Sequence, residues 1–218
     1  MKVGILWDLD GTLLNTLEDL TDSVNHTLAE FGCPERTIEE IRTFVGTGAK
    51  NLIKKALPGK ESDPDVDEVL AAYQEYYATH AQVKTAPYAG VLEALAEIGK
   101  RYPIAIVSNK PDRPVKLLCK DYFGDIYALG ETPDCPRKPA ADMVFKGMKA
   151  IGVEACIYVG DSETDVQTAK NAGMPCLSVL WGFRDRAVLA AEGSKHFCED
   201  PKELPKMLDA LMEEYYGQ

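Results

Sequence analysis

The amino-acid sequence predicts an α/β fold: a parallel sheet covered by helices on both faces, with an all-helical unit inserted near the N-terminus. Short apolar runs alternate with segments of helical periodicity from about residue 90 onward. A similar apolar run opens the chain, and residues 16–83 contain helical patterns without a convincing strand. Alternating strands and helices are typical of parallel sheets, whose two apolar faces both need covering helices.

The chain begins with one strand and then enters the helical unit. The apolar run at residues 3–7 ends at acidic residues and predicts a buried strand. The segment after it has apolar residues at helical spacing, which predicts a helix. These residues are Leu17, Leu20, Val24, Leu28 and Phe31. Further helices are expected at residues 38–45, 48–57 and 65–80.

The remaining strands and helices follow Pro87. The expected strands lie at residues 103–108, 126–129, 155–159 and 176–180. The expected helices lie at residues 90–101, 112–122, 140–151, 162–172, 184–192 and 201–215. We therefore expect a Rossmann-like core made of residues 1–15 and 84–218, and a helical cap made of residues 16–83. Ligands of such sheets bind beyond the carboxyl ends of the strands.

Composition restricts the classes of partner. A length of 218 residues suffices for one core and a smaller inserted domain. The net charge of −11 repels nucleic acid and anionic membranes, so neither is expected as a partner. No window approaches the ~18 apolar residues of a membrane span, and the first apolar run is too short for a signal peptide. The six cysteines are too far apart in sequence for a zinc or redox motif, which favours reduced thiols in a cytoplasmic protein. The expected oligomeric state is a monomer or a homodimer.

The first polar cluster, Asp8-Leu9-Asp10-Gly11-Thr12, follows the first strand directly. Residues two apart in extended backbone point the same way, so Asp8 and Asp10 are expected to share one pocket. Two neighbouring carboxylates repel each other, and a hard divalent cation would stabilise them. For this cluster alone, a strand that ends in an Asp-Gly turn is an equally good explanation.

Two further clusters supply hydrogen-bond donors and a positive charge. Ser108-Asn109-Lys110 ends the strand at residues 103–108, and its hydroxyl and amide can bind phosphate oxygens. Lys138-Pro139 opens the helix expected at residue 140, where a lysine can approach an anion at the helix N-terminus. Taken singly, an N-cap for the first cluster and a solvated lysine for the second are the better explanations.

The fourth cluster, residues 160–165, places Asp161, Glu163 and Asp165 at one junction between a strand and a helix. Helix capping explains one or two such acids well, and all three less well. Jointly the four clusters supply carboxylates for a metal, hydroxyl and amide donors, and a lysine. These are the groups that phosphoryl transfer needs, because its catalysis consists mostly of positioning and charge neutralisation.

With these four motifs in this order, the chain resembles the haloacid dehalogenase superfamily, in its phosphatase branch with a helical cap after the first motif. Within that superfamily it is most similar to phosphoglycolate phosphatases and related small-metabolite phosphatases. The stretches at residues 44–50 and 181–184 resemble theirs. Two departures are Trp7, where phenylalanine is common, and Asn15-Thr16, where many relatives have Asp-Ser.

The resemblance implies a role for each site residue. Asp8 would be the nucleophile that forms an aspartyl-phosphate, and Asp10 the general acid and base. Mg²⁺ would be held by the Asp8 carboxylate, the Asp10 backbone carbonyl and Asp161. Asp165 would support Lys138 or the metal site. The groups expected to bind the phosphoryl oxygens are Thr12, Ser108, Asn109 and Lys138. Lys50 and Lys54 of the cap are candidates for binding the leaving group, with solvated helix lysines as the alternative.

The expected substrate is a small phosphorylated metabolite, most like phosphoglycolate. A phosphosugar mutase, a pyrophosphatase and a 5′-nucleotidase on the same scaffold remain alternatives. Asp10 favours phosphate-ester chemistry, because the dehalogenases and phosphonatases of the superfamily lack this second acid. A signalling receiver that accepts phosphate on an aspartate is disfavoured, because receivers carry no helical cap and keep their acidic pair apart from the phosphorylated aspartate.

Overall fold

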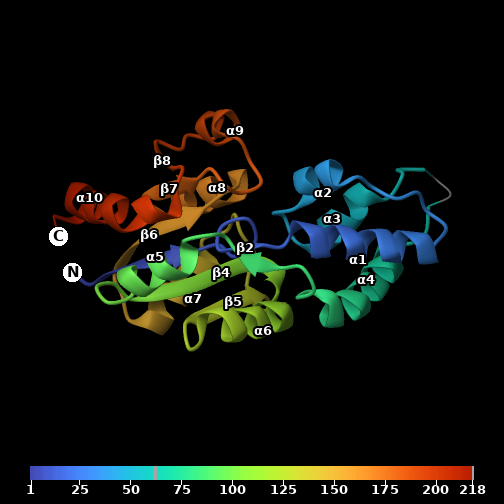
Figure 1. Ribbon diagram of the computed structural model, residues 1–218, viewed down its shortest axis with the longest axis horizontal. Helices are drawn as coiled ribbons and strands as arrows, with labels where there is room; N and C mark the ends of the chain where they lie inside the picture. Colours follow the sequence, from blue (N-terminus) through green and yellow to red (C-terminus); the bar gives the residue numbers. More distant parts are fainter. Residues whose placement is uncertain (61–62, 218) are drawn as a thin grey trace.

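The computed structural model describes residues 1–60 and 63–217, and within them it contains a six-stranded parallel sheet with helices on both faces (Figure 1). Its strand order is β5-β4-β1-β6-β7-β8. The strands are β1 (Val3–Trp7), β4 (Ile104–Pro111), β5 (Tyr127–Glu131), β6 (Ala155–Gly160), β7 (Cys176–Val179) and β8 (His196–Cys198). The predicted fold class is confirmed, and β8 is an addition that the sequence did not predict.

The two faces of the sheet follow the alternation of side chains along a strand. In β1, Val3, Ile5 and Trp7 pack on one side, while Leu6 packs on the other. The first side is covered by α5 (Val91–Ile98), α6 (Asp112–Phe123) and α10 (Leu204–Tyr216). The second side is covered by α7 (Asp142–Ile151) and α8 (Glu163–Ala172). Because both faces are covered, β1 is buried along its whole length and holds the residues that follow it in place.

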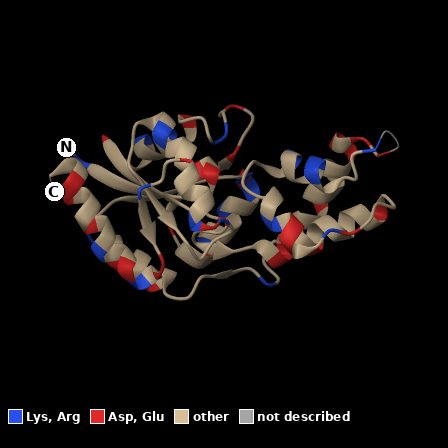
Figure 2. Ribbon diagram, turned by 90° about the horizontal axis from the view of Figure 1, so that it is seen from above, with Lys and Arg blue, Asp and Glu red and all other residues tan. Residues whose placement is uncertain are grey.

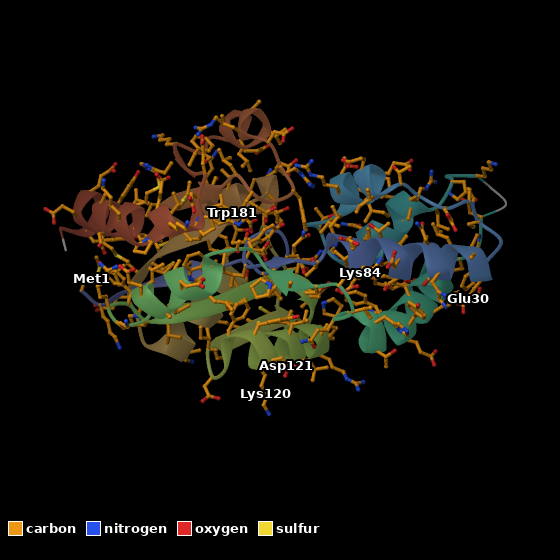
Figure 3. All side chains as sticks on the ribbon, in the orientation of Figure 1. Met1, Glu30, Lys84, Lys120, Asp121 and Trp181 are labelled. Atoms are coloured by element: carbon orange, nitrogen blue, oxygen red, sulfur yellow. The ribbon has the colours of Figure 1, made fainter. Side chains whose placement is uncertain are left out.

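The first four helices of the chain form a separate apolar cluster at one end of the molecule (Figure 1). They are α1 (Leu17–Glu30), α2 (Ile38–Phe44), α3 (Ala49–Ala56) and α4 (Val66–His80). Phe183 from the sheet domain joins this cluster. In Figure 3 the labelled Met1 and Glu30 lie at opposite ends of the molecule, and Lys84 lies between them where the chain returns to the sheet.

The two connections between the helices and the sheet domain run side by side. β2 (Leu14–Asn15) pairs antiparallel with β3 (Ala86–Pro87). The buried Asp19 carboxylate of α1 accepts hydrogen bonds from the backbone N–H groups of residues 83–85, at 2.8–3.0 Å. A buried carboxylate with several such donors is well compensated for its lost hydration, so both connections are held to α1.

Some boundaries differ from the sequence-based expectation where they matter for the site. The strand expected at residues 103–108 continues to Pro111, with a shift of register against β5 between Val107 and Pro111. The helix expected from residue 140 begins at Asp142, so Lys138 lies in the preceding loop rather than at a helix N-terminus. The last helical segment begins with a 3₁₀ turn, η1 (Pro201–Glu203), and α9 spans Arg186–Ala191.

The surface carries charges of both signs on the outer helices of both parts of the molecule (Figure 2). Within the described residues, no helix combines the length and the apolar character that crossing a membrane requires.

Candidate active site

Three neighbouring strands bring the sequence motifs to one cavity. Asp8 and Asp10 follow β1, Asp161 follows β6, and the Ser108–Asn109–Lys110 stretch lies near the end of β4. Because β1 lies between β4 and β6, all three motifs meet at the carboxyl edge of the sheet. They line a cavity of about 40 Å³. The helical unit closes its other side with Leu20, Val45, Gly46, Gly48, Ala49, Leu52, Tyr73 and Tyr77.

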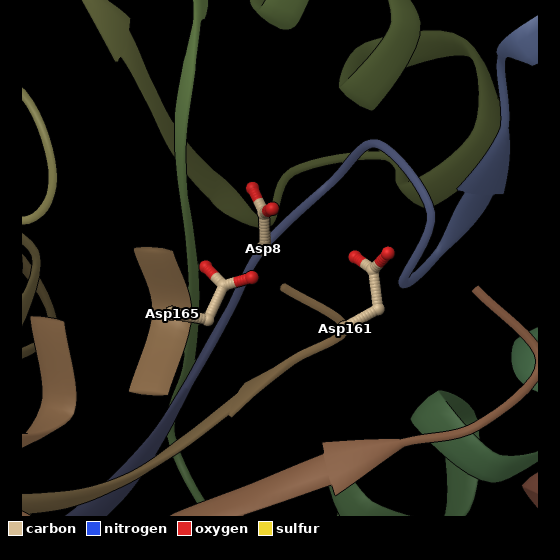
Figure 4. Close-up of side chains that lie close together, drawn as sticks. All are labelled: Asp8, Asp161 and Asp165. Atoms are coloured by element: carbon tan, nitrogen blue, oxygen red, sulfur yellow. The ribbon is translucent and has the colours of Figure 1, made fainter. Parts of the chain in front are cut away.

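Three buried carboxylates lie close together at this edge (Figure 4). Asp8, Asp161 and Asp165 each place one oxygen within 4.8 Å of the others. Burial, and then the nearby charge of Asp165, raise the pKa of Asp8 to about 7. The same two causes, burial first, raise the pKa of Asp161 well above its ordinary value. The cluster is therefore strained when it is fully ionised, and a divalent cation with oxygen ligands would relieve the repulsion.

Asp161 is held by two donors from different parts of the chain. Thr12 Oγ1 donates to Asp161 Oδ1 at 2.9 Å, and the backbone N–H of Phe183 donates to Oδ2 at 2.7 Å. Gly11 has φ +82°, and a Cβ there would lie 2.4 Å from Asp161 Oδ2, so the Asp-Gly turn needs its glycine. Thr12 is fully buried and does not line the cavity. In this structure the Thr12 hydroxyl positions Asp161, and its expected role in binding phosphate stays a prediction.

Asp165 accepts hydrogen bonds at both carboxylate oxygens. Its Oδ1 accepts from Lys138 Nζ at 2.8 Å and from the Tyr158 hydroxyl at 3.2 Å. Its Oδ2 accepts from the backbone N–H of Ser162 at 3.0 Å and from the Ser162 hydroxyl at 2.6 Å. Both oxygens have hydrogen-bond partners within the protein. Asp165 therefore orients Lys138 through one oxygen and caps the N-terminus of α8 through the other. Helix capping accounts for this acid, whereas it does not account for Asp161.

Lys138 lies beside Asp8 despite being far from it in sequence. Its Nζ is 2.8 Å from Asp8 Oδ1, 2.8 Å from Asp165 Oδ1 and 3.0 Å from the Tyr158 hydroxyl. Burial opposes the charge, but the Asp165 and Asp8 carboxylates outweigh burial and raise the pKa of Lys138 well above its ordinary value. The lysine is therefore a permanent positive charge next to Asp8.

Asn109 lines the cavity and holds the backbone at Lys138 with its side-chain amide. Its Oδ1 accepts from the Lys138 N–H at 2.8 Å, and its Nδ2 donates to the Lys138 carbonyl at 2.9 Å and to the Gly46 carbonyl at 3.1 Å. Both side-chain N–H groups are therefore used within the protein, and the expected contact of Asn109 with phosphate stays a prediction, since the residue also lines the cavity. Ser108, by contrast, lines the cavity, and its hydroxyl accepts a bond from the Lys110 N–H at 3.3 Å. Neither residue caps α6, whose N-cap is Pro111.

The structure adds Lys110, to which sequence reasoning assigned no role of its own. Its side chain is 2% exposed, and its Nζ lies 2.9 Å from Asp10 Oδ1 and 4.7 Å from the centre of the Tyr77 ring. Among the described residues that line the cavity, it is the only basic one. The available signal was its place beside Ser108 and Asn109, but its partner Asp10 lies 100 positions away in sequence.

The two cap lysines expected at the site lie outside it. Lys50 forms an ion pair with Asp67 at 2.6 Å, and both side chains are more than half exposed. Lys54 is exposed as well, and neither residue lines the cavity. The helix α3 turns Ala49 and Leu52 toward the cavity instead. The alternative explanation, solvated helix lysines, is the one that the structure supports.

A reciprocal pair of arginines joins the helical unit to the sheet domain. Arg184 donates to the backbone carbonyls of Arg42, Thr43 and Val45, at 2.7–3.3 Å, and pairs with Glu163 at 2.7 Å. In return, Arg42 donates to the carbonyl of Phe183 at 2.8 Å. The N–H of Phe183 binds Asp161, so the contact between the two parts and the carboxylate cluster share one loop.

Buried carboxylates, a fixed lysine and a second acid meet at one cavity of an α/β fold, an arrangement suited to a hydrolase. The family model for haloacid dehalogenase-like hydrolases matches residues 5–179, and the chain belongs to that family.

Relatives of known name agree with this class. The chain is 33% identical over 221 residues to phosphoglycolate phosphatase 1 of Pseudomonas aeruginosa, covering 96% of this chain and 80% of that protein. It is 35% identical over 201 residues to a phosphoglycolate phosphatase of Mesorhizobium japonicum, covering 87% and 88%. A crystal structure of a candidate phosphoglycolate phosphatase from Lactobacillus delbrueckii subsp. bulgaricus superposes with a TM-score of 0.86 at 32% identity, covering 94% of this chain and 97% of that one. The chain is therefore a phosphatase of this family.

Proposed function

We propose that the chain is a Mg²⁺-dependent phosphomonoesterase, most like a phosphoglycolate phosphatase, that works through a phosphate ester of Asp8. One observation carries this proposal: Asp8 lies 2.8 Å from the Lys138 ammonium, beside Asp161, in a cavity that also contains Asp10. A carboxylate can approach an anionic phosphate only where positive charge offsets the repulsion. Lys138 supplies part of that charge permanently.

The donor set fits a hard dication. We propose that Mg²⁺ is held by the carboxylates of Asp8 and Asp161 and by the backbone carbonyl of Asp10, because oxygen ligands are the ones it prefers. When bound, the ion would neutralise charge on the transferring phosphoryl group. Thr12 and Phe183 keep Asp161 in place for this role. Burial and the neighbouring Asp165 raise the pKa values of Asp8 and Asp161, and a bound cation would favour their ionised forms.

Hydrolysis then divides into two displacements. In the first, a carboxylate oxygen of Asp8 forms a bond to phosphorus while the bond to the leaving oxygen breaks, and Asp10 donates a proton to that oxygen. In the second, Asp10 removes a proton from a water molecule, the water oxygen bonds to phosphorus, and Asp8 leaves as a carboxylate. Ser108 lines the cavity and is the hydroxyl placed to donate to a phosphoryl oxygen.

We propose that residues 16–83 act as a cap on a core made of residues 1–15 and 84–218. The helical residues close the cavity, and the paired connections β2 and β3 are the place where a hinge would lie. Closure would keep bulk water from the aspartyl-phosphate step. The cavity is small, about 40 Å³, and the helical residues that line it are apolar or aromatic apart from two glycines, so we infer a substrate with a small leaving group.

The test is a hydrolysis screen with and without Mg²⁺. Phosphoglycolate, hexose phosphates, a nucleoside monophosphate, pyrophosphate and an aryl phosphate are offered to the purified protein at equal concentration. We expect preference for phosphoglycolate, dependence on Mg²⁺, and loss of turnover in Asp8→Asn with the fold retained by circular dichroism. Preference for pyrophosphate or the nucleotide, or transfer that requires a sugar bisphosphate, would replace the proposed substrate. Wild-type rates in Asp8→Asn would overturn the mechanism.

A further inference from the structure

Lys110 is a buried cation whose hydrogen bonds the protein does not fully use. An ammonium has three donors. Lys138, the other buried lysine of the site, directs its Nζ to three oxygens, those of Asp8, Asp165 and Tyr158. Among the described residues, Lys110 Nζ has one oxygen partner, Asp10 Oδ1, and it also lies over the Tyr77 ring. Since buried donors are nearly always satisfied, this ammonium has capacity for a further acceptor in the cavity.

Tyr77 presents a second unused donor in the same cavity. Its hydroxyl is buried and has no hydrogen-bond partner, and the residue lines the cavity with Lys110. Burial, and then the charge of Asp10, raise the pKa of Tyr77 well above its ordinary value, so the hydroxyl stays protonated and can donate. Lys110 and Tyr77 line one small cavity, and each has a donor that no protein oxygen takes up, so together they are suited to an anion.

The place of Lys110 relative to Asp10 indicates which part of a substrate it meets. A general acid must lie within about 2.6–3.2 Å of the leaving oxygen. Lys110 Nζ is itself 2.9 Å from the Asp10 carboxylate. It therefore lies next to the part of the substrate that is attached to the leaving oxygen. In phosphoglycolate a single methylene separates the leaving oxygen from a carboxylate. The carboxylate therefore falls within reach of the ammonium, whereas the phosphoryl group lies at Asp8 and Lys138.

We propose that Lys110, assisted by the Tyr77 hydroxyl, is the residue that selects a leaving group with a negative charge one carbon from the ester oxygen. This inference rests on the proposed phosphatase function and assigns to the sheet domain a role that the cap lysines Lys50 and Lys54 do not fill. Lys138 and the proposed Mg²⁺ are taken up by the carboxylates of Asp8, Asp161 and Asp165 and by the phosphoryl group. Without Lys110, a substrate carboxylate beside Asp10 would meet a negative charge with no lysine next to it. Lys110 therefore favours an ester whose leaving group carries a carboxylate, whereas an ester with an uncharged leaving group leaves the remaining donors of the ammonium unused.

The test compares two esters with the same two-carbon chain, phosphoglycolate and ethyl phosphate, of which only the first carries a carboxylate, and uses the ratio of their kcat/KM values. Lys110→Met is expected to lower this ratio by about 30-fold or more, the smaller end of the cost of removing one member of a buried charge pair. Lys110→Arg should retain part of the preference. Lys54→Met removes the same charge from the exposed face of α3 and should leave the ratio at the wild-type value.

The possible outcomes separate this inference from the phosphatase itself. Equal loss of both rates in Lys110→Met, with an unchanged ratio, would show that Lys110 only positions Asp10 and would overturn its role in selection. A wild-type protein that hydrolyses both esters equally well would also overturn it, while the phosphatase function stands. Hydrolysis of neither ester in the presence of Mg²⁺ would contradict the proposed function. If Lys110→Met does not fold, Tyr77→Phe, which removes only an unpaired hydroxyl, is expected to lower the same ratio and takes its place.

Discussion

The side chain of Asn109 binds both polar groups of the Lys138 backbone, accepting from its N–H at 2.8 Å and donating to its carbonyl at 2.9 Å. All of these groups are buried. This reciprocal pair fixes a loop residue to the end of β4, and it places the ammonium of Lys138 beside Asp8. Positioning of this kind matters because a displacement of about 1 Å in a catalytic group can cost 10²-fold in rate.

Asn109→Ala is expected to lower kcat by roughly 10²-fold and to lower stability by about 1–3 kcal/mol, because two backbone groups of Lys138 lose their partner in a buried place. Steady-state kinetics and denaturant unfolding measure the two effects. The matched control is Asn171→Ala, which removes an exposed bond to the neighbouring Pro139 carbonyl and should change kcat little. An Asn109→Ala protein with the wild-type kcat would contradict the positioning role.

The carboxylate cluster makes the metal-free protein sensitive to pH. The pKa of Asp8 is about 7 in the folded protein against an ordinary value of 3.8, so between these values the folded state binds more protons than the unfolded state. Stability in the presence of a chelator should therefore fall as pH rises from 3.8 to about 7. Asp8→Asn removes the titrating carboxyl and should therefore raise the Tm above that of the wild type at pH 8. Each kcal/mol gained in the free energy of unfolding corresponds to about 2–4 °C.

Thermal unfolding at pH 6 and pH 8 checks this expectation. Mg²⁺ should raise the wild-type Tm more at pH 8 than at pH 6, because protons and the metal compete for the same carboxylates. Asp121→Asn, which removes an exposed acid (Figure 3), should behave as the wild type. A chelated Asp8→Asn protein that is less stable than the wild type at pH 8 would show that repulsion in the cluster is not the dominant effect.

Tyr77→Phe is expected to stabilise the protein by about 1 kcal/mol, because an unpaired buried hydroxyl keeps its desolvation penalty without a compensating bond. Urea unfolding midpoints measure the change, and Tyr122→Phe provides the contrast. The Tyr122 hydroxyl donates to the Thr85 carbonyl at 2.6 Å, so removing it should destabilise. A Tyr77→Phe protein less stable than the wild type would mean that the hydroxyl has a hydrogen-bond partner in solution. It would then not be available to donate to a ligand.

Arg184 is expected to keep the helical unit closed over the cavity. Arg184→Ala removes its bonds to three carbonyls at the end of α2 and should raise the KM for the preferred substrate by on the order of tenfold, since closure helps to hold the substrate. Faster amide hydrogen exchange in residues 43–48 should accompany the change. Arg186→Ala, which removes an exposed pair with Glu199, is the control. Unchanged KM and exchange in Arg184→Ala would mean that closure does not depend on these bonds.

The sequence predicted the fold class and the four motifs because these depend on local patterns. Period-two burial, short apolar runs and helical spacing are all visible within a few residues of one another, and β1 and α1 fall close to their expected bounds. β8 is only three residues long, too short for a periodic signal, and its strand character depends on pairing with β7.

The partners of the site residues depend on distant contacts. The position of Lys110 depends on the continuation of β4 past Ser108 and on a partner 100 positions earlier. Thr12 turns to Asp161, 149 positions away, rather than to the cavity. For Lys50 and Lys54, a local signal existed: the apolar positions of α3 predict which face of that helix is buried, and both lysines lie off it.

The central claim is that Asp8 carries the phosphoryl group during turnover. The most direct test mixes excess protein, Mg²⁺ and phosphoglycolate, stops the reaction with acid within one turnover, and locates protein-bound phosphate by mass spectrometry of peptides. We predict a phosphoryl group on Asp8 in the wild-type protein, sensitive to hydroxylamine, and none in Asp8→Asn. Turnover without any protein-bound phosphate, or with the phosphate on another residue, would contradict the account.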